Sequence, residues 1–170
     1  MLTSALLSLV AAGCGGKSPD TKANEAYADS VCTAIGTWEQ QIKSLATGFS
    51  GSISKASLQA KVTQAESATE TLVNQIKAVP PPNTSQGQAA KQQLDQLSSD
   101  ITNGVNAAKT SLGQIKGNAS VAAISAALAT LAPQVQSFAS ETKSAISTQK
   151  SAGGSLSKAF KSTDSCKSLG

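Results

Sequence analysis

Large apolar residues recur along the chain at alternating spacings of three and four residues. The first run contains Val31, Ile35, Trp38, Ile42, Leu45 and Phe49. Because an α-helix turns once every 3.6 residues, this spacing places the side chains on one face. The run therefore predicts an amphipathic helix that begins near Asn24 and ends at Gly48 and Gly51.

Three later segments carry the same period, and proline or glycine separates them. Their largest apolar residues are Leu58, Val62, Leu72 and Ile76, then Leu94, Leu97, Ile101, Val105 and Leu112, then Ile124, Leu128, Leu131, Val135 and Phe138. We expect helices over about residues 54–79, 85–116 and 120–150. Pro80–Pro82 ends the second helix because proline has no N–H, and Gly117 ends the third.

Two residues interrupt the third and fourth predicted helices. Gly104 allows a neighbouring helix to approach closely, or the third helix to bend. Pro133 removes a backbone hydrogen bond to Ala129, so we expect a kink in the fourth helix.

A short helix is expected after Gly153 and Gly154, with Ser155 as its N-cap and with Leu156 and Phe160 turned inwards. Four periodic segments with short connections favour an all-α fold. The predicted architecture is an antiparallel up-down four-helix bundle with a short fifth C-terminal helix, spanning residues 23–170.

Composition and charge narrow the functions that such a bundle can have. Aromatic residues make up 3% of the 170 residues, so the core is thin and needs close packing or a covalent staple. The net charge is +4, but the lysines are scattered and arginine is absent, so we expect no nucleic-acid partner. Histidine is absent too, which excludes Ser-His-Asp catalysis and histidine-containing zinc sites.

The N-terminus carries a short apolar run, Leu2–Val10, followed by Ala11-Ala12-Gly13-Cys14. This junction resembles the lipobox of bacterial lipoproteins. The resemblance implies cleavage before Cys14, acylation of the Cys14 sulfur and anchoring on the outer face of the cell membrane. Residues 1–13 are then a signal segment, which we expect to be N-terminally truncated because no lysine or arginine lies near Met1. Residues 14–22 are a flexible tether.

The wider layout is loosely similar to small lipid-anchored helical proteins of actinobacteria with no assigned activity. The residues that carry this likeness are Cys32, Pro80–Pro82, and the C-terminal Ala159-Phe160 and Asp164-Ser165-Cys166.

Acylation of Cys14 leaves two of the three cysteines, Cys32 and Cys166. In an exported protein such a pair of cysteines can be oxidised to a disulfide, which would join the C-terminus to the first helix. A buried free thiol at each position, or a bond between molecules, is the alternative.

No residues indicate catalysis, a cofactor or a metal. Glu66 and Glu70 lie one helical turn apart, but Ser, Thr and Ala surround them, so we expect a solvated face. The function hypothesis is therefore a non-catalytic interaction or structural module of the cell envelope, with a protein or envelope partner. The alternative is a carrier or sensor of a small apolar ligand, held in a cavity lined by Trp38 and Phe138.

Overall fold

The computed structural model describes residues 18–47, 54–115 and 121–169, and in the first half of the fourth helix it describes only some side chains. These residues form helices and no strand. The helices are α1 (Pro19–Thr47), α2 (Lys55–Ala78), α3 (Ser85–Gly113), α4 (Val121–Ser151), α5 (Gly154–Ser162) and α6 (Asp164–Lys167). The predicted all-α class is confirmed.

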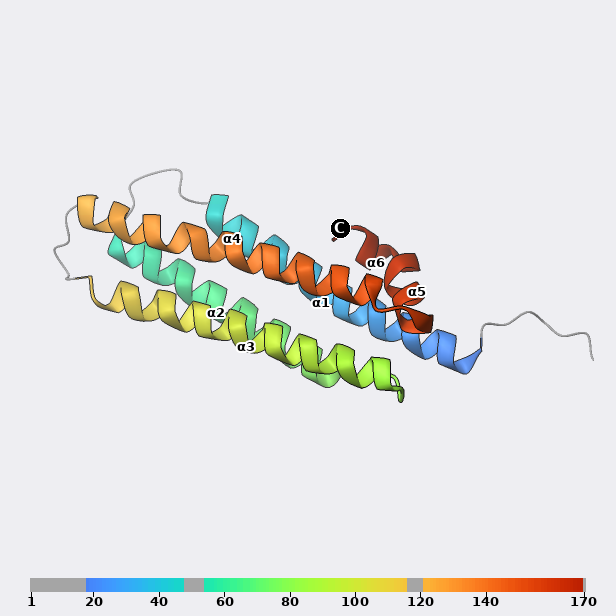
Figure 1. Ribbon diagram of the computed structural model, residues 1–170. Helices are drawn as coiled ribbons and strands as arrows, with labels where there is room; N and C mark the ends of the chain where they lie inside the picture. The colour runs from blue at the N-terminus through green and yellow to red at the C-terminus, as the bar shows by residue number, and fades with distance from the viewer. Residues whose placement is uncertain (1–17, 48–53, 116–120, 170) are drawn as a thin grey trace, which may run out of the picture.

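The four long helices lie side by side, and α5 and α6 pack against one end of this bundle (Figure 1). One apolar cluster joins α1, α2, α3 and the C-terminal helices. The predicted single C-terminal helix is wrong in one respect, because the segment is split into α5 and α6. Helix α6 has four residues, too few to show a helical period in the sequence.

Helix α1 begins at Pro19, earlier than the expected start at Asn24. Proline is favourable in the first turn, because its missing N–H has no helical partner there and its φ is already helical. The Ser18 hydroxyl accepts a hydrogen bond from the backbone N–H of Thr21 at 3.3 Å. Residues 19–22 are therefore helical, although the sequence analysis assigned them to the tether. Residues 1–17 lie outside the described residues, so the signal segment and the rest of the tether stay predictions.

Helices α2 and α3 begin where the sequence predicts. Ser54 caps α2 through a reciprocal pair of hydrogen bonds with Ser57. Thr84 caps α3 by accepting from the N–H of Gly87 at 3.0 Å. A Cβ at Gly87 would lie 2.1 Å from the Pro82 carbonyl oxygen, so the turn after the prolines requires glycine at this position.

Helix α5 has a different cap from the one predicted. Gly153, with a φ of 79°, is its N-cap, and Gly154 also has a positive φ of 70°. Only glycine adopts this conformation without strain, so the pair fixes the turn between α4 and α5. Ser155 instead accepts a hydrogen bond from Asn24 Nδ2 at 2.9 Å.

The apolar stripes face the core as predicted. In α1, Val31, Ile35 and Trp38 are buried and Ile42 is partly buried. The buried members in later helices are Leu58, Leu72, Ile76, Leu94, Leu97, Ile101, Val105, Leu112, Leu156 and Phe160. Phe49 and the α4 side chains before Phe138 that form its predicted stripe lie outside the described set.

Gly104 is the point of close approach between α3 and α4. A Cβ there would lie 1.8 Å from Phe138 Cζ, so the phenyl ring occupies the space that any other residue would fill. Phe138 in turn packs against the main core cluster. The expected role of Gly104 in close packing is confirmed. Pro133 lies inside α4, which continues on both sides of it.

We predict that Gly104→Ala lowers the free energy of unfolding by about 1–3 kcal/mol, because the new methyl group forces the Phe138 ring to move. The measurement is urea unfolding followed by circular dichroism. Gly113→Ala is the matched control in the same helix, because nothing lies within 4 Å of its Cβ position. An equal loss of unfolding free energy in both variants would mean that packing of the Phe138 ring does not require a glycine at position 104.

Candidate functional site

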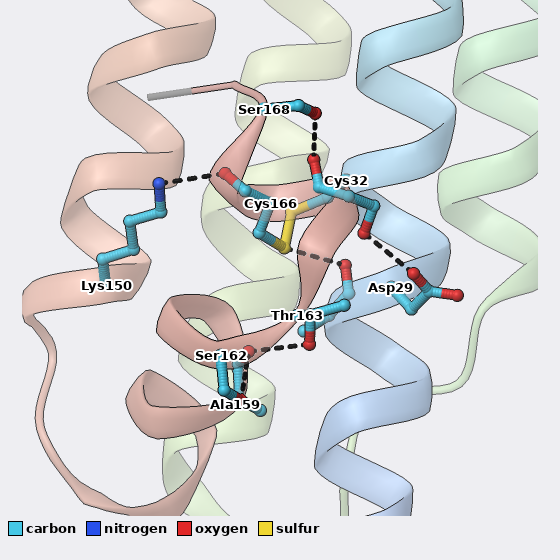
Figure 2. The surroundings of a disulfide bond; sticks show 10 residues. Asp29, Cys32, Lys150, Ala159, Ser162, Thr163, Cys166 and Ser168 are labelled. Carbon is cyan, nitrogen blue, oxygen red and sulfur yellow. Dashed lines mark hydrogen bonds between the residues drawn. A yellow bond between two sulfur atoms is a disulfide. The ribbon is translucent and has the colours of Figure 1, made fainter.

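A disulfide joins Cys32 of α1 to Cys166 of α6, as the sequence predicts (Figure 2). The two Cα atoms are 5.0 Å apart, and 134 residues separate the cysteines in sequence. Both side chains are buried, with exposed fractions of 1% and 0%. Closing a loop of this size stabilises the folded state by about 4–5 kcal/mol in the chain-entropy model. The bond thus supplies the staple that the thin core needs.

The heptad pattern of α1 places Cys32 next to Val31, on the side of the helix that α6 covers. The Cys166 Sγ lies 3.3 Å from the Ala28 carbonyl oxygen. This is a packing contact and not a hydrogen bond, because an oxidised sulfur has no proton to donate.

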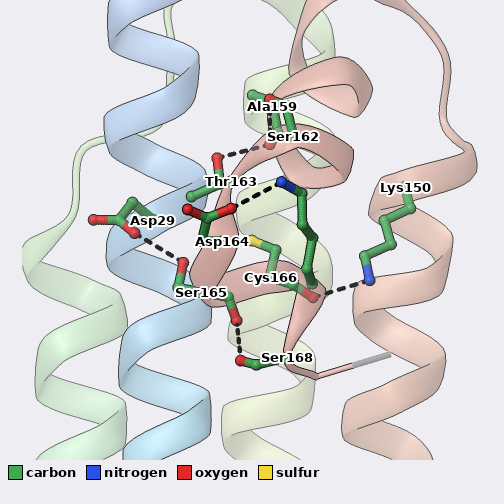
Figure 3. A network of polar contacts seen from close by, with 10 residues as sticks. Asp29, Lys150, Ala159, Ser162, Thr163, Asp164, Ser165, Cys166 and Ser168 are labelled. Atoms are coloured by element: carbon green, nitrogen blue, oxygen red, sulfur yellow. Dashed lines mark hydrogen bonds and ion pairs between the residues drawn. The ribbon is translucent and has the colours of Figure 1, made fainter.

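Polar contacts surround the disulfide on both sides (Figure 3). Lys150 Nζ donates to the Cys166 carbonyl oxygen at 3.0 Å, which links α4 to α6. Ser165 Oγ donates to Asp29 Oδ1 at 2.8 Å, which links α6 to α1. These bonds hold α6 in place from two different helices.

Asp164 lies on the solvent side of α6. Its ion pair with Lys167, at 2.8 Å, lowers the pKa of the Asp164 carboxyl below its usual range through a hydrogen bond and through charge. The pair is exposed, so it contributes little to stability.

Tyr27 and Phe160 form the aromatic contact of this region. Their ring centres are 6.3 Å apart, and the planes meet edge to face at 82°. Burial, and secondarily the charge of Asp95, raises the pKa of the Tyr27 hydroxyl to about 12. The Tyr27 phenol therefore stays protonated at pH 10, where an exposed tyrosine is half ionised.

Asn24 is a site residue that the sequence analysis missed. It is 2% exposed, and its Nδ2 donates to Ser155, while its Oδ1 is buried without a partner. The signal was present in the sequence, because continuing the stripe backwards from Val31 by the same spacing reaches Ala28 and Asn24.

Trp38 and Phe138, the predicted lining of a ligand cavity, have protein groups as neighbours. Trp38 Nε1 donates to Thr69 Oγ1 at 3.1 Å inside the core. Phe138 covers Gly104. Neither residue lines either of two recesses on the surface of the described residues. A ligand cavity between them stays a prediction.

Both recesses are shallow. One, of about 400 Å³ between α1 and α2, is lined by Gln41, Ser44, Leu45, Thr63, Gln64, Ser67, Ala68 and Thr71. The other, of about 600 Å³ between α1 and the C-terminal helices, is lined by Lys22, Glu25, Ala26, Asp29, Ser162, Thr163 and Asp164. The first carries amides and hydroxyls without charge, so it suits a neutral polar partner.

No group of three or more acidic or cysteine side chains in residues 18–47, 54–115 and 121–169 is placed to hold a metal ion. Glu66 pairs with Lys109 of α3 at 2.7 Å, and Glu70 is exposed. No helix in these ranges is both long enough and apolar enough to cross a bilayer.

Comparison with protein-family models, curated proteins and solved structures finds no match to this chain. Cys14, the predicted lipidation site, lies outside the described residues.

Peptide mapping tests the cysteine pairing directly. We expect the protein isolated from an oxidising compartment to give one disulfide-linked peptide pair that contains Cys32 and Cys166. Reduction should separate the two peptides. Recovery of both cysteines as alkylated thiols without reduction would contradict the pairing.

Titration of Tyr27, the one tyrosine in the sequence, tests its burial. With a pKa of about 12 in the folded state and 10.0 as the ordinary value, the unfolded chain loses its phenol proton first. The contribution to stability is constant below pH 10 and falls between pH 10 and 12, by about 1.4 kcal/mol per pH unit. Phenolate absorbance of the folded protein should accordingly stay absent at pH 10. Titration with a midpoint at pH 10 while the helices remain intact would show that the side chain is accessible.

Proposed function

We propose that this protein is a lipid-anchored protein of the cell envelope, whose helical bundle is a non-catalytic interaction or structural module outside the cytoplasm. The observation that carries the proposal is the pairing of Cys32 with Cys166. Disulfides persist mainly in oxidising compartments. The pairing also leaves Cys14 as the remaining one of three cysteines, at the end of the signal-like apolar run.

The proposed anchor is the acylated sulfur of Cys14. Two acyl chains anchor a protein stably, because each buried methylene contributes about 0.8 kcal/mol. Four residues, Gly15 to Ser18, lie between Cys14 and Pro19, where α1 begins, so the two Cα atoms are five Cα–Cα steps apart. A fully extended chain of this length reaches about 17 Å. An anchored bundle would therefore sit close to the membrane surface.

We propose that the four long helices alternate in direction. Along α3 and α4, Gln93 bonds to Gln149 at 2.5 Å, whereas Gly104 contacts Phe138, so contacts that are later in α3 are earlier in α4. Along α2 and α3, Glu66 pairs with Lys109, and Lys55 bonds to the Ile115 carbonyl oxygen. Both helix pairs support the antiparallel up-down order.

The partner surface that we favour is the uncharged recess between α1 and α2. Its rim offers amide and hydroxyl groups, including Gln41, Gln64 and Ser67, above an apolar floor of Leu45 and Ala68. Such a surface suits an uncharged segment of an envelope protein or polymer, which it would hold by hydrogen bonds.

Metabolic labelling with a palmitate analogue tests the anchor. We expect Cys14→Ser to abolish labelling and to move the protein from the membrane fraction to the soluble fraction, because the acylated sulfur is removed. Cys166→Ser is the matched control, because it removes a cysteine whose sulfur is bonded to Cys32. This variant should keep both the palmitate label and the membrane association. Unchanged labelling of Cys14→Ser would refute the proposed function.

A further inference from the structure

Residues 154–169, which we name the C-terminal clasp, fold back over the end of the bundle. The clasp contains α5 and α6 and lies against α1 and α4 (Figure 1). It follows Gly153 and Gly154, both with positive φ. Nothing lies within 4 Å of a Cβ position at Gly153. A Cβ at Gly154 would lie 2.4 Å from Gln86 Oε1, so the turn packs against α3, and the clasp must break this contact as it swings about Gly153, the open position of the pair.

The clasp covers apolar surface of α1 with a few side chains. Phe160 packs on Tyr27, and Leu169 lies over Gly36, with its Cδ2 3.5 Å from that residue's Cβ position. Leu156 and Ala159 are buried in the same cluster. The polar links to the bundle are the contacts of Ser155, Ser165 and the Cys166 carbonyl already described, together with the Ser157 hydroxyl on the Lys150 carbonyl oxygen.

The helices of the clasp are too short to be stable by themselves. Helix α5 has 9 residues and α6 has 4. Isolated helices shorter than about 12–15 residues are marginal in water. Their structure therefore depends on docking, and the disulfide keeps the docking surfaces together at high effective concentration.

We propose that the clasp is a redox-controlled unit: reduction of the Cys32–Cys166 bond lets residues 154–169 detach about the Gly153–Gly154 hinge while α1 to α4 stay folded. Detachment uncovers the α1 surface around Tyr27 and Val31. The proposal shares the Cys32–Cys166 bond with the proposed function, but it does not depend on acylation of Cys14 or on the α1–α2 recess.

The reductant is a dithiol, either a small molecule or the active-site pair of a thiol–disulfide oxidoreductase. One thiolate of the reductant attacks a protein sulfur, which forms a mixed disulfide and releases the other cysteine as a thiolate. The second thiol of the reductant then breaks the mixed disulfide and releases the second cysteine. Two electrons pass to Cys32 and Cys166, which take up two protons, and the reductant leaves as a disulfide.

Burial of the sulfurs makes opening of the clasp a condition for reduction. Cys32 and Cys166 are 1% and 0% exposed, so a thiolate reaches them only when side chains of the clasp that cover the bond move aside in a local opening, while the bond still joins α6 to α1. The contacts that hold the clasp therefore set the rate at which the disulfide is reduced. They also determine whether the clasp detaches once the bond is broken.

Limited proteolysis with a protease that cleaves after lysine tests the proposal on the full chain. Lys158 and Lys161 are exposed residues of the clasp, whereas Lys91 and Lys109 lie in α3 and serve as internal controls. Cleavage of a helix requires local opening, so its rate follows the population of the open state. We expect dithiothreitol to raise cleavage at Lys158 and Lys161 by about tenfold or more. Cleavage at Lys91 and Lys109 should remain unchanged.

Two outcomes overturn the proposal. If Lys158 and Lys161 stay as protected after reduction as before, the clasp docks without the bond. If lysines of α3 become sensitive in parallel with those of the clasp, the whole bundle loosens and no separate unit exists. Cys166→Ser without a reductant should reproduce the pattern of the reduced protein, and the pattern of the oxidised protein there would equally contradict the inference.

A second measurement follows the rate of reduction by dithiothreitol through the appearance of alkylatable thiols. Phe160→Ala removes the ring that packs on Tyr27, and it should accelerate reduction by about tenfold or more. Leu112→Ala makes a comparable cavity in α3, outside the clasp, and should leave the rate unchanged. Equal rates in the two variants would contradict gating by the clasp.

Discussion

The covalent bond between Cys32 and Cys166 connects the first helix to the end of the chain, and the C-terminal packing depends on it. Aromatic residues make up 3% of the sequence, and much of the remaining core is alanine or a β-branched residue. A bond across 134 residues removes loop entropy worth about 4–5 kcal/mol in the chain-entropy model, which is a large share of a typical domain's stability of about 5–15 kcal/mol. The bond also explains how helices as short as α5 and α6 remain ordered.

Polar residues at core positions give the bundle its register. Asn24, Thr69 and Gln149 are buried, and each makes a hydrogen bond to a different helix: Asn24 to Ser155, Thr69 to Trp38 and Gln149 to Gln93. A shift of one helix by a turn would break these bonds and leave buried polar groups without partners. Gly104 adds a steric constraint of the same kind, since only this position accommodates the Phe138 ring.

The periodic pattern was sufficient to predict the four long helices and the buried faces of α1, α2 and α3, and the two cysteines left after Cys14 was assigned to acylation predicted the disulfide. The pattern did not predict the start of α1, the N-cap of α5 or the existence of α6. The start of α1 depends on Ser18 and Pro19. Serine and proline are common in linkers, so the sequence did not indicate a helix there. The N-cap of α5 is Gly153 and not the predicted Ser155. The Ser155 hydroxyl instead accepts a hydrogen bond from Asn24, 131 residues away. Helix α6 has no period to detect. The candidate site could be predicted only in part. The sequence shows the two cysteines, but it does not show which contacts bury them.

The most direct test of the account is urea unfolding of the oxidised protein and of the Cys32→Ala, Cys166→Ala double variant, followed by the fluorescence of Trp38. Trp38 is the one tryptophan in the sequence and lies in the core between α1 and α2. The account predicts that the oxidised protein is more stable by about 2–5 kcal/mol and that both proteins unfold cooperatively. Equal midpoints for the two proteins would contradict the account.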